Sequence, residues 1–398
     1  MNNLQTKLTN TYTTIKTNIL SAYTSNDNLP SIVLYFICFI IIVLMVLWVL
    51  NIYTLDSRNC NYMNQLYINR PKLANIESSN FNIENEQHNK NNFTHKLHDY
   101  YIKTAYNCCC AGNYKNDFVN LCALKNCITQ GVRALDMQIY SLNDNPVIAT
   151  ASFDNNTTKE TYNSLPLSTV LSTIYDYAFS QLFCPNWRDP LILHFRIMSD
   201  NKTIYNKIAK LLKQHLKDKL LSSKYSYENR NTNLTNDRIL DFVDKIIISV
   251  DKSNKTFLDT KLHEFINISS NSFYMRLLRY TNDVKFTPDM KELIEYNKTN
   301  LSFCLPDLSN KILYPNFDIT SKFGVQLTAM PFQNNDTNLE WYNDAFLQNN
   351  YAFILKDKKL RYIPETVVVE TIPEKQRLSS DRRTVFQVGL GAPTTIII

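Results

Sequence analysis

The sequence predicts an α/β fold, a parallel (β/α)8-type barrel that is preceded by a single transmembrane helix. Three observations predict it. The run from Ile32 to Leu50 is apolar without interruption. From about Tyr100, short apolar runs alternate with stretches of helical periodicity, which is typical of parallel βα units. This region ends near Pro364, so it has roughly the 250 residues of one such barrel.

Composition limits the class of protein. A chain of 398 residues allows one large domain with appendages, or two domains. The chain has only 5 Gly, and neither a Walker-type loop nor a GxGxxG motif occurs in it. Its net charge is +6, and the basic residues are spread among acids rather than gathered in a stripe. No nucleic-acid partner is therefore predicted.

The apolar run has the length of a membrane span. No charged residue lies between Asp27 and Asp56, and a bilayer core needs about 20 apolar residues in a helix. A buried core helix is disfavoured because the run lacks a polar face. A cleaved signal peptide is disfavoured because its apolar core has only about 7–15 residues. Aromatic residues suited to the membrane interface lie near both ends: Tyr35, Trp48 and Tyr53. The bilayer is therefore one predicted partner.

The residues before the span carry one apolar stripe. It recurs at three- and four-residue steps, as in an amphipathic helix, at Leu4, Leu8, Tyr12, Ile15, Ile19 and Tyr23. Such a helix would lie on the membrane or pack on a partner, and a short frayed helix explains the pattern equally well. Basic residues on both sides of the span give no clear orientation. A short tail before a long domain is nevertheless the pattern of a signal anchor, which places the C-terminal domain on the non-cytosolic side.

These patterns divide the chain into five segments. They are an N-terminal tail with the amphipathic helix (1–30), the transmembrane helix (31–53), a polar Asn-rich linker (54–98), the barrel (99–364) and a C-terminal tail (365–398). Strands are predicted at Ala134–Tyr140, Pro146–Ala149, Leu191–Ile197, Lys245–Val250, Val325–Ala329 and Ala352–Leu355, and helices at Leu167–Phe183, Ile204–Leu221 and Leu339–Gln348. The 9 Cys lack zinc-site spacing, and both disulfides and reduced buried thiols explain them.

Seven segments, in the same order as in the family, resemble the catalytic barrel of phosphoinositide-specific phospholipase C. They are Tyr101–Asn107, Gly131–Asp136 (the G-C-R-x-x-E motif), Asn145–Ile148, Pro190–Leu193, Asn297–Ser302, Phe323–Gln333 and Phe346–Lys356. Together they extend from Tyr100 to Arg361 and cover both halves of that barrel. The resemblance implies a phospholipase-C-like (β/α)8 barrel with its site at the carboxyl ends of the strands.

The family cleaves its phosphodiester with two His residues and a calcium ion held by oxygen ligands. In this chain Tyr106 stands at the first His position and Thr150 at the second. Asn107 and Asp136 match two of the calcium ligands, whereas Gln138 and Arg196 replace two ligand carboxylates. A guanidinium group would repel a divalent cation. The resemblance therefore implies that the calcium site is lost, that no cofactor is bound, and that a remnant pocket holds Asn107, Asp136, Gln138, His194 and Arg196.

The positions that contact substrate in the family are altered as well. Ser249 and Asp251 stand where lysines contact the inositol phosphates. Phe303 stands where an Arg contacts phosphate, and Leu305 where a Tyr stacks on the ring. The framework residues of the family persist here, while its reactive groups do not.

Three hypotheses follow. The first is a membrane-anchored, catalytically inactive barrel (a pseudoenzyme) that binds a protein partner or a lipid headgroup or has a structural role. The second is an active phosphatidylinositol phosphodiesterase in which Arg196 replaces the metal, as in some bacterial relatives, and His194 on the same strand face serves as acid or base. Against it, the favoured interpretation is that His194 is a satisfied core residue and Arg196 an internal ion-pair partner of Asp136. The third is a structural membrane protein of a large DNA virus particle, suggested by the Asn-rich, Gly-poor composition.

Overall fold

The computed structural model describes residues 13–17, 29–69, 71–77, 93–153, 157–364, 383–386 and 394–397. Internal contacts divide the chain into two units, Met1–Arg361 and Tyr362–Ile398. In the second unit, β12 (Arg383–Phe386) pairs with β13 (Thr394–Ile397) in an antiparallel ladder. Of the predicted amphipathic helix within 1–30, only residues 13–17 are described, and they are helical; the rest lies outside the described residues.

The apolar run forms the first part of one long helix, α2 (Leu29–Leu66). This helix is long and apolar enough to cross a membrane, and its described apolar side chains between Val33 and Leu50 are exposed. The segment predicted as a linker (54–98) begins as helix, because α2 continues to Leu66 without a Pro or Gly to end it. Residues 71–77 are not free linker either, since Leu73 and Ile76 are buried against the barrel. Residues 78–92 lie outside the described residues.

Eight of the described strands form a nearly closed parallel barrel. They are β1 (Tyr100–Ala105), β2 (Ala134–Leu142), β5 (Leu191–Ile197), β6 (Ile246–Asp251), β7 (Ile268–Ser270), β8 (Met275–Arg279), β9 (Leu301–Leu305) and β10 (Leu327–Met330). Their order is β7-β6-β5-β2-β1-β10-β9-β8, and every ladder between neighbours is parallel. Within the described part of the chain, no ladder joins β7 to β8, so the barrel is open there.

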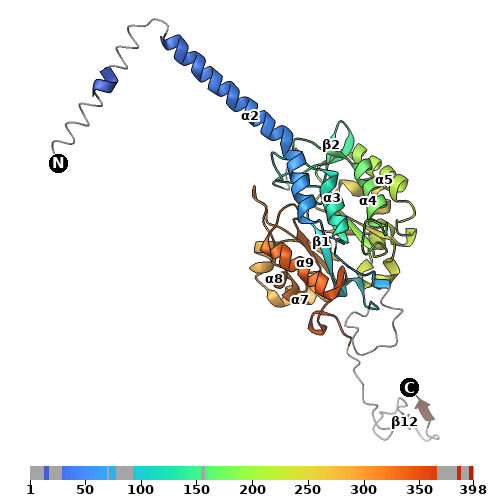
Figure 1. The fold of residues 1–398 in the computed structure, drawn as a ribbon. Helices are drawn as coiled ribbons and strands as arrows, with labels where there is room; N and C mark the ends of the chain where they lie inside the picture. The colour runs from blue at the N-terminus through green and yellow to red at the C-terminus, as the bar shows by residue number, and fades with distance from the viewer. Residues whose placement is uncertain are drawn as a thin grey trace, which may run out of the picture. The chain divides into compact units, whose positions relative to one another are not determined.

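Helices cover the outside of the barrel (Figure 1). They are α3 (Leu121–Thr129), α4 (Leu167–Ala178), α5 (Lys202–Leu216), α6 (Ser226–Asn231), α7 (Met290–Asn297), α8 (Phe317–Lys322) and α9 (Thr337–Asn349), with a π-helical turn at Tyr280–Lys285. The predicted α/β barrel is therefore confirmed. We call the end at which the barrel strands finish the mouth, and the opposite end the foot.

Two predicted strands lie outside the barrel. The strand predicted at Pro146–Ala149 is β3 (Asn145–Ile148), which pairs antiparallel with β2 and also with β4 (Leu165–Pro166). The strand predicted at Ala352–Leu355 is β11 (Phe353–Leu355), which pairs antiparallel with β1. Their residues predict a strand, but not which neighbour it joins, because pairing depends on residues far along the chain.

The core has two layers, one on each side of the barrel wall. Apolar residues inside the barrel include Ile102, Ala134, Ile192 and Phe303. The layer between the barrel and its helices is larger and includes Leu135, Leu193 and Ile248 from the strands. Alternate residues of each strand thus pack into the inner and the outer layer, as the two-residue period of a β-strand requires. On β2 and β5, the same alternation sends polar residues into the barrel.

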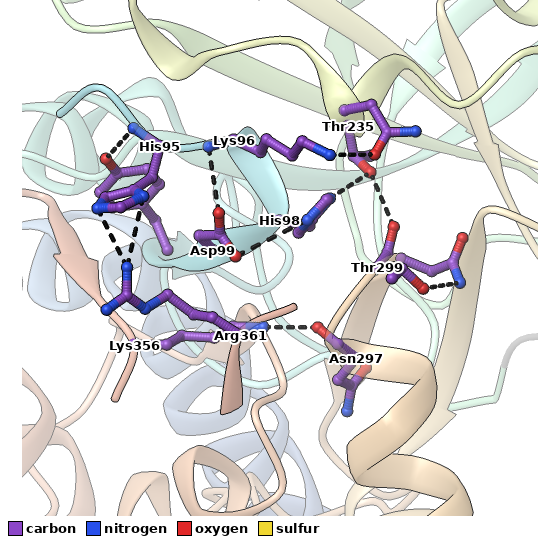
Figure 2. A network of polar contacts seen from close by, with 12 residues as sticks. His95, Lys96, His98, Asp99, Thr235, Asn297, Thr299, Lys356 and Arg361 are labelled. Atoms are coloured by element: carbon purple, nitrogen blue, oxygen red, sulfur yellow. Dashed lines mark hydrogen bonds and ion pairs between the residues drawn. The ribbon is translucent and has the colours of Figure 1, made fainter. Parts of the chain in front are cut away.

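The foot of the barrel buries a polar cluster, which Figure 2 shows. This foot cluster consists of His98, Asp99, Thr235, Asn297 and Lys356, all buried. The side chain of His98 lies 3.1 Å from the hydroxyl of Thr235, and its other nitrogen lies 3.7 Å from the carboxyl group of Asp99. The ammonium group of Lys356 donates to the carbonyl of Asn297 at 2.8 Å. All five residues precede or follow strands at the foot, so the cluster closes that end of the barrel.

Candidate functional site at the barrel mouth

The remnant-pocket residues lie together at the mouth. Asp136 and Gln138 are on β2 and pair in register with His194 and Arg196 on β5. Asn107 follows the end of β1 and has a left-handed backbone (φ 42°). Because successive residues on a strand alternate sides, all four strand residues point to the same side of the wall. The sequence-based expectation that His194 and Arg196 share a strand face is confirmed.

Asp136 and Arg196 form a bidentate ion pair. The Nε atom of Arg196 donates to Oδ1 of Asp136 at 2.9 Å, and its Nη2 atom donates to Oδ2 at 2.7 Å. Both side chains are fully buried. Two parallel hydrogen bonds fix the relative orientation of the two planar groups as well as their distance. The internal ion pair that the sequence left as an alternative is therefore present.

Asn107 and His194 complete this arrangement, which we call the mouth network (Asn107, Asp136, His194 and Arg196). Nη2 of Arg196 also donates to the side-chain oxygen of Asn107 at 2.8 Å, and the backbone amide of Asn107 donates to Asp136 at 3.1 Å. Nδ1 of His194 lies 2.8 Å from Oδ1 of Asp136, and its Nε2 lies 2.8 Å from the hydroxyl of Ser270. A His194 that donates to Asp136 can accept at Nε2 from Ser270, so one neutral tautomer satisfies both contacts.

In the mouth network, Asp136 and Arg196 both favour their ionised forms although they are buried. Burial by itself would raise the pKa of Asp136, but the Arg196 guanidinium and the hydrogen bond from His194 hold it well below its usual range. Burial would likewise lower the pKa of Arg196, yet the Asp136 carboxylate raises it above its ordinary value. Each partner therefore keeps the other ionised in surroundings that exclude water.

Tyr106 and Thr150, which the sequence resemblance places at the two His positions of the family, are held by other contacts. The guanidinium of Arg196 lies 4.8 Å from the ring centre of Tyr106, a cation–π distance. The ring of Tyr106 also meets Tyr114 edge-on at 5.4 Å. Thr150 donates its hydroxyl proton to the carbonyl of Tyr114 at 2.9 Å. Tyr106 and Thr150 are thus held by packing and by the backbone, and both are buried.

Gln138 contacts the loop that follows β3. Its side-chain oxygen accepts from the backbone amide of Ala151 at 3.0 Å, which ties β2 to the loop after β3. The structure brings Asn107, Asp136, His194 and Arg196 into direct contact. Gln138 shares their face of the wall and also binds that loop.

The substrate-side positions also turn inward. Phe303 stacks on the ring of His194 with the two centres 4.5 Å apart. Ser249 is buried with its hydroxyl 3.7 Å from the sulfur of Met275, and Leu305 is buried. Only Asp251 is partly exposed; its carboxylate accepts from the amide of Ser253 at 2.9 Å and from the side chain of Asn271 at 2.8 Å. Sequence reasoning did not identify Ser270 or Tyr114, because neither lies in a motif or near the network along the chain.

A cavity of about 580 Å³ opens at the mouth beside the network. It lies where β7 and β8 are not joined, and its lining includes Ile197, Asp200, Asp251, Lys255, Asn271 and Arg279. The four network residues do not line it. The open space at the mouth and the buried ion pair are therefore two separate places, on neighbouring strands.

Comparison with known proteins gives a family match for part of the sequence and similar folds among solved structures. Residues 93–252 match the family described as phosphatidylinositol-specific phospholipase C, X domain. The fold is similar to the crystal structure of PLC21 from L. pealei, with a TM-score of 0.56, 16% identity, and coverage of 68% of this chain and 38% of that one. For PLC21 from S. officinalis the TM-score is 0.56, the identity 16%, and the coverage 70% and 39%. The chain thus spans about two fifths of the length of these two proteins. No curated protein sequence matches it.

Proposed function

We propose that the protein is a membrane-anchored, catalytically inactive barrel with a binding or structural role, and the premise is the match of residues 93–252 to the X domain of phosphatidylinositol-specific phospholipase C. One observation carries the proposal. The guanidinium of Arg196 is bound to both Asp136 and Asn107, the two side chains that would otherwise offer oxygen atoms to a calcium ion. The positive charge that phosphodiester cleavage would require, on Arg196, is already neutralised by Asp136 inside the fold.

General acid–base catalysis is the first function that these residues do not support. Cleaving a phosphodiester through a neighbouring hydroxyl needs a base, an acid for the leaving alkoxide, and positive charge near the phosphoryl oxygens. Tyr106 and Thr150 are buried at the two imidazole positions. The Thr150 hydroxyl donates to a backbone carbonyl, and the Tyr106 ring is packed against Arg196 and Tyr114, so neither side chain stands in for an imidazole that transfers protons.

Calcium binding is the second function that these residues do not support. Calcium takes six to eight oxygen ligands, with carboxylates among them. Both oxygens of Asp136 accept from Arg196, and in the part of the chain that the structure describes, no group of three or more His, Cys, Asp or Glu side chains could hold a metal. This donor set does not fit a divalent cation, and the buried guanidinium would repel one.

The rival function is a calcium-independent phosphodiesterase that uses His194 and Arg196. It needs His194 to reach substrate. The ring is fully buried, both of its nitrogens are within hydrogen-bond distance of protein partners, and Phe303 stacks on it. The barrel would have to open before His194 could move a proton to or from a substrate, so the geometry favours the inactive barrel.

A turnover assay tests the proposal. The full-length protein is incubated with phosphatidylinositol vesicles, with calcium or with chelator, and soluble inositol phosphate is measured. We expect no release above the protein-free background, and no change in melting temperature on adding calcium. Turnover that disappears in His194→Ala, but persists in His215→Ala on the outer helix α5, would establish the rival function. A calcium-dependent rise in melting temperature would contradict the loss of the metal site.

Anchoring is the other half of the proposal. It is supported by the length and apolar surface of α2, and the disulfide between Cys60 and Cys122 favours a barrel on the oxidising, non-cytosolic side. We expect the full chain to stay with membranes in alkaline carbonate. In sealed microsomes, the barrel should be protected from added protease. Release by carbonate would contradict the span, and digestion of the barrel in sealed microsomes would contradict its side.

A further inference from the structure

The C-terminal part of α2 is fixed along helix α3. Asn120 donates to both carboxylate oxygens of Asp56 at 2.9 and 3.0 Å. Cys60 is joined to Cys122, and Asn126 donates to Asn64 at 2.8 Å. These positions on α2 are four residues apart, so they form one stripe that faces the barrel. Buried Met63 lies in the same stripe.

The order of these contacts sets the direction of α2. Positions 56, 60 and 64 of α2 meet positions 120, 122 and 126 in ascending order, so α2 runs parallel to α3. Helix α3 follows the end of β1 and precedes the start of β2, so it runs from mouth to foot. The apolar part of α2, which precedes Asp56, therefore projects from the mouth end of the barrel (Figure 1).

The distance between the apolar run and the barrel is short. Leu50 ends the uninterrupted apolar run, and Asp56 makes the first of these contacts six residues later. At about 1.5 Å per residue, this is roughly 9 Å of helix. No Pro or Gly lies between them to kink it. Each headgroup layer of a bilayer is roughly 5–8 Å thick, so the first contact with the barrel comes at the outer edge of that layer.

We propose that α2 holds the barrel with its mouth facing the bilayer that α2 crosses, and that the loops around the mouth rest on the lipid headgroups. This inference rests on the proposed membrane span. The loops that follow the barrel strands, together with the loop that follows β3 and reaches the mouth cavity at Thr157, form what we call the rim, which exposes Phe153 (49%), Phe286 (66%), Leu308 and Leu313. The rim also exposes Lys115, Lys255, Lys285 and Lys311. Apolar and cationic side chains on one face suit the interface of a membrane with anionic lipids.

One consequence concerns the cavity at the mouth. It opens between the ends of β5, β6 and β8, on the same side as the rim. In this orientation its entrance faces polar lipid headgroups rather than bulk water. The direction of α2 therefore sets what the entrance of the cavity faces, independently of the affinity of the cavity for a ligand.

Quenching by a headgroup-labelled lipid tests the orientation. An environment-sensitive fluorophore is attached to single cysteines in the full chain carrying Cys38→Ser, because the other described free cysteines are buried. Phe153→Cys and Phe286→Cys report the rim, and Leu182→Cys and Lys217→Cys report exposed positions near the foot. In phosphatidylcholine vesicles containing a lipid with a nitroxide on its headgroup, we expect several-fold stronger quenching at the rim than at the foot.

The outcomes separate this inference from the span on which it rests. Failure of the chain to float with vesicles would refute the span. Flotation with equal quenching at rim and foot, or stronger quenching at the foot, would overturn the orientation alone. A flexible Gly/Ser insertion of about 12 residues after Leu55, which spans roughly 20 Å as coil, should retain flotation and lower rim quenching to the level at the foot. Undiminished rim quenching in that variant would show that α2 does not set the orientation.

Discussion

At the mouth of the barrel, the Asp136 carboxylate and the Arg196 guanidinium share hydrogen bonds of 2.9 and 2.7 Å. At the foot, the Lys356 ammonium donates to the backbone carbonyl of Asn297, and the imidazole of His98 lies 3.7 Å from the Asp99 carboxyl group. Both clusters are buried. At the mouth, two opposite charges are in direct contact. At the foot, the ionisable side chains contact mainly neutral groups.

The difference appears in the pKa values. At the mouth, each ionised partner favours the ionised form of the other, despite burial. At the foot, burial dominates: it lowers the pKa of His98 to about 3, raises that of Asp99 and lowers that of Lys356 well below its ordinary value. A buried side chain thus keeps its charge where a counter-charge touches it and favours its neutral form where only dipoles do. The mouth network therefore keeps one ionisation state, whereas the stability that the foot cluster contributes depends on pH.

The largest expected effect is the loss of Arg196. In Arg196→Met, the Asp136 carboxylate would be buried without its counter-charge, which typically costs about 3–5 kcal/mol of unfolding free energy. The measurement is chemical denaturation of the full chain in micelles. The control is Arg188→Met, which removes a partly exposed pair with Glu77 and should cost no more than about 1 kcal/mol. Equal costs for the two variants would mean that the mouth pair is not the tight buried pair described above.

A smaller effect is expected from pH at the foot. The folded pKa of His98 is about 3 and its ordinary value is 6.5, so between these values the unfolded chain binds more protons. Stability from His98 is therefore complete above pH 6.5 and is lost as pH falls toward 3. The raised pKa of Asp99 acts in the opposite direction, so the His98 effect is isolated by comparison with His98→Gln.

Between pH 7.5 and 5, wild type should lose on the order of 2 kcal/mol more than His98→Gln. The mouth should contribute no change in that range. The pKa of Asp136 is held below its usual value, so its contribution is lost only as pH falls below about 4. Parallel pH profiles for wild type and His98→Gln would refute the assignment of the pH response to the foot.

The smallest expected effect is the loss of Lys356. The carbonyl of Asn297 that accepts from Lys356 also accepts from the side chain of Gln326 at 2.9 Å. Lys356→Met therefore leaves that carbonyl satisfied and replaces a buried amine with an apolar side chain of similar length. We expect the unfolding free energy to change by about 1 kcal/mol or less. A cost as large as that of Arg196→Met would show that the foot depends on its charges as strongly as the mouth does.

The barrel strands differ in how well the sequence predicts them. β5 (Leu191–Ile197) agrees with its prediction at both ends, because a run of apolar residues after Pro190 predicts a buried strand without help from its neighbours. β7 has only three residues and β8 is half-buried and carries two Arg, so neither shows a strand pattern, and both form only because the barrel wall requires them there. The continuation of α2 to Leu66 was missed for a similar reason, since its polar stripe has meaning only against α3.

The candidate site shows the same division. Motif order placed Asn107, Asp136, Gln138, His194 and Arg196 at one end of a barrel, and their chemistry alone suggested an ion pair. The contacts of His194 with Ser270 and Phe303 join residues more than 70 positions apart, and no local pattern predicts such a distance. The absence of catalysis and a role in a virus particle stay predictions.

The sequence by itself determined an apolar helix of membrane length and an α/β barrel, because these depend on residue type and on local periodicity, whereas the replacement of reactive side chains is implied only by the resemblance and stays a prediction. Only the tertiary structure decided that Arg196 is enclosed by Asp136 and Asn107, and that α2 lies along α3 in a direction that puts its apolar part on the mouth side. Both depend on which distant segments meet, and that is settled by packing around a common core rather than by any one stretch of the chain.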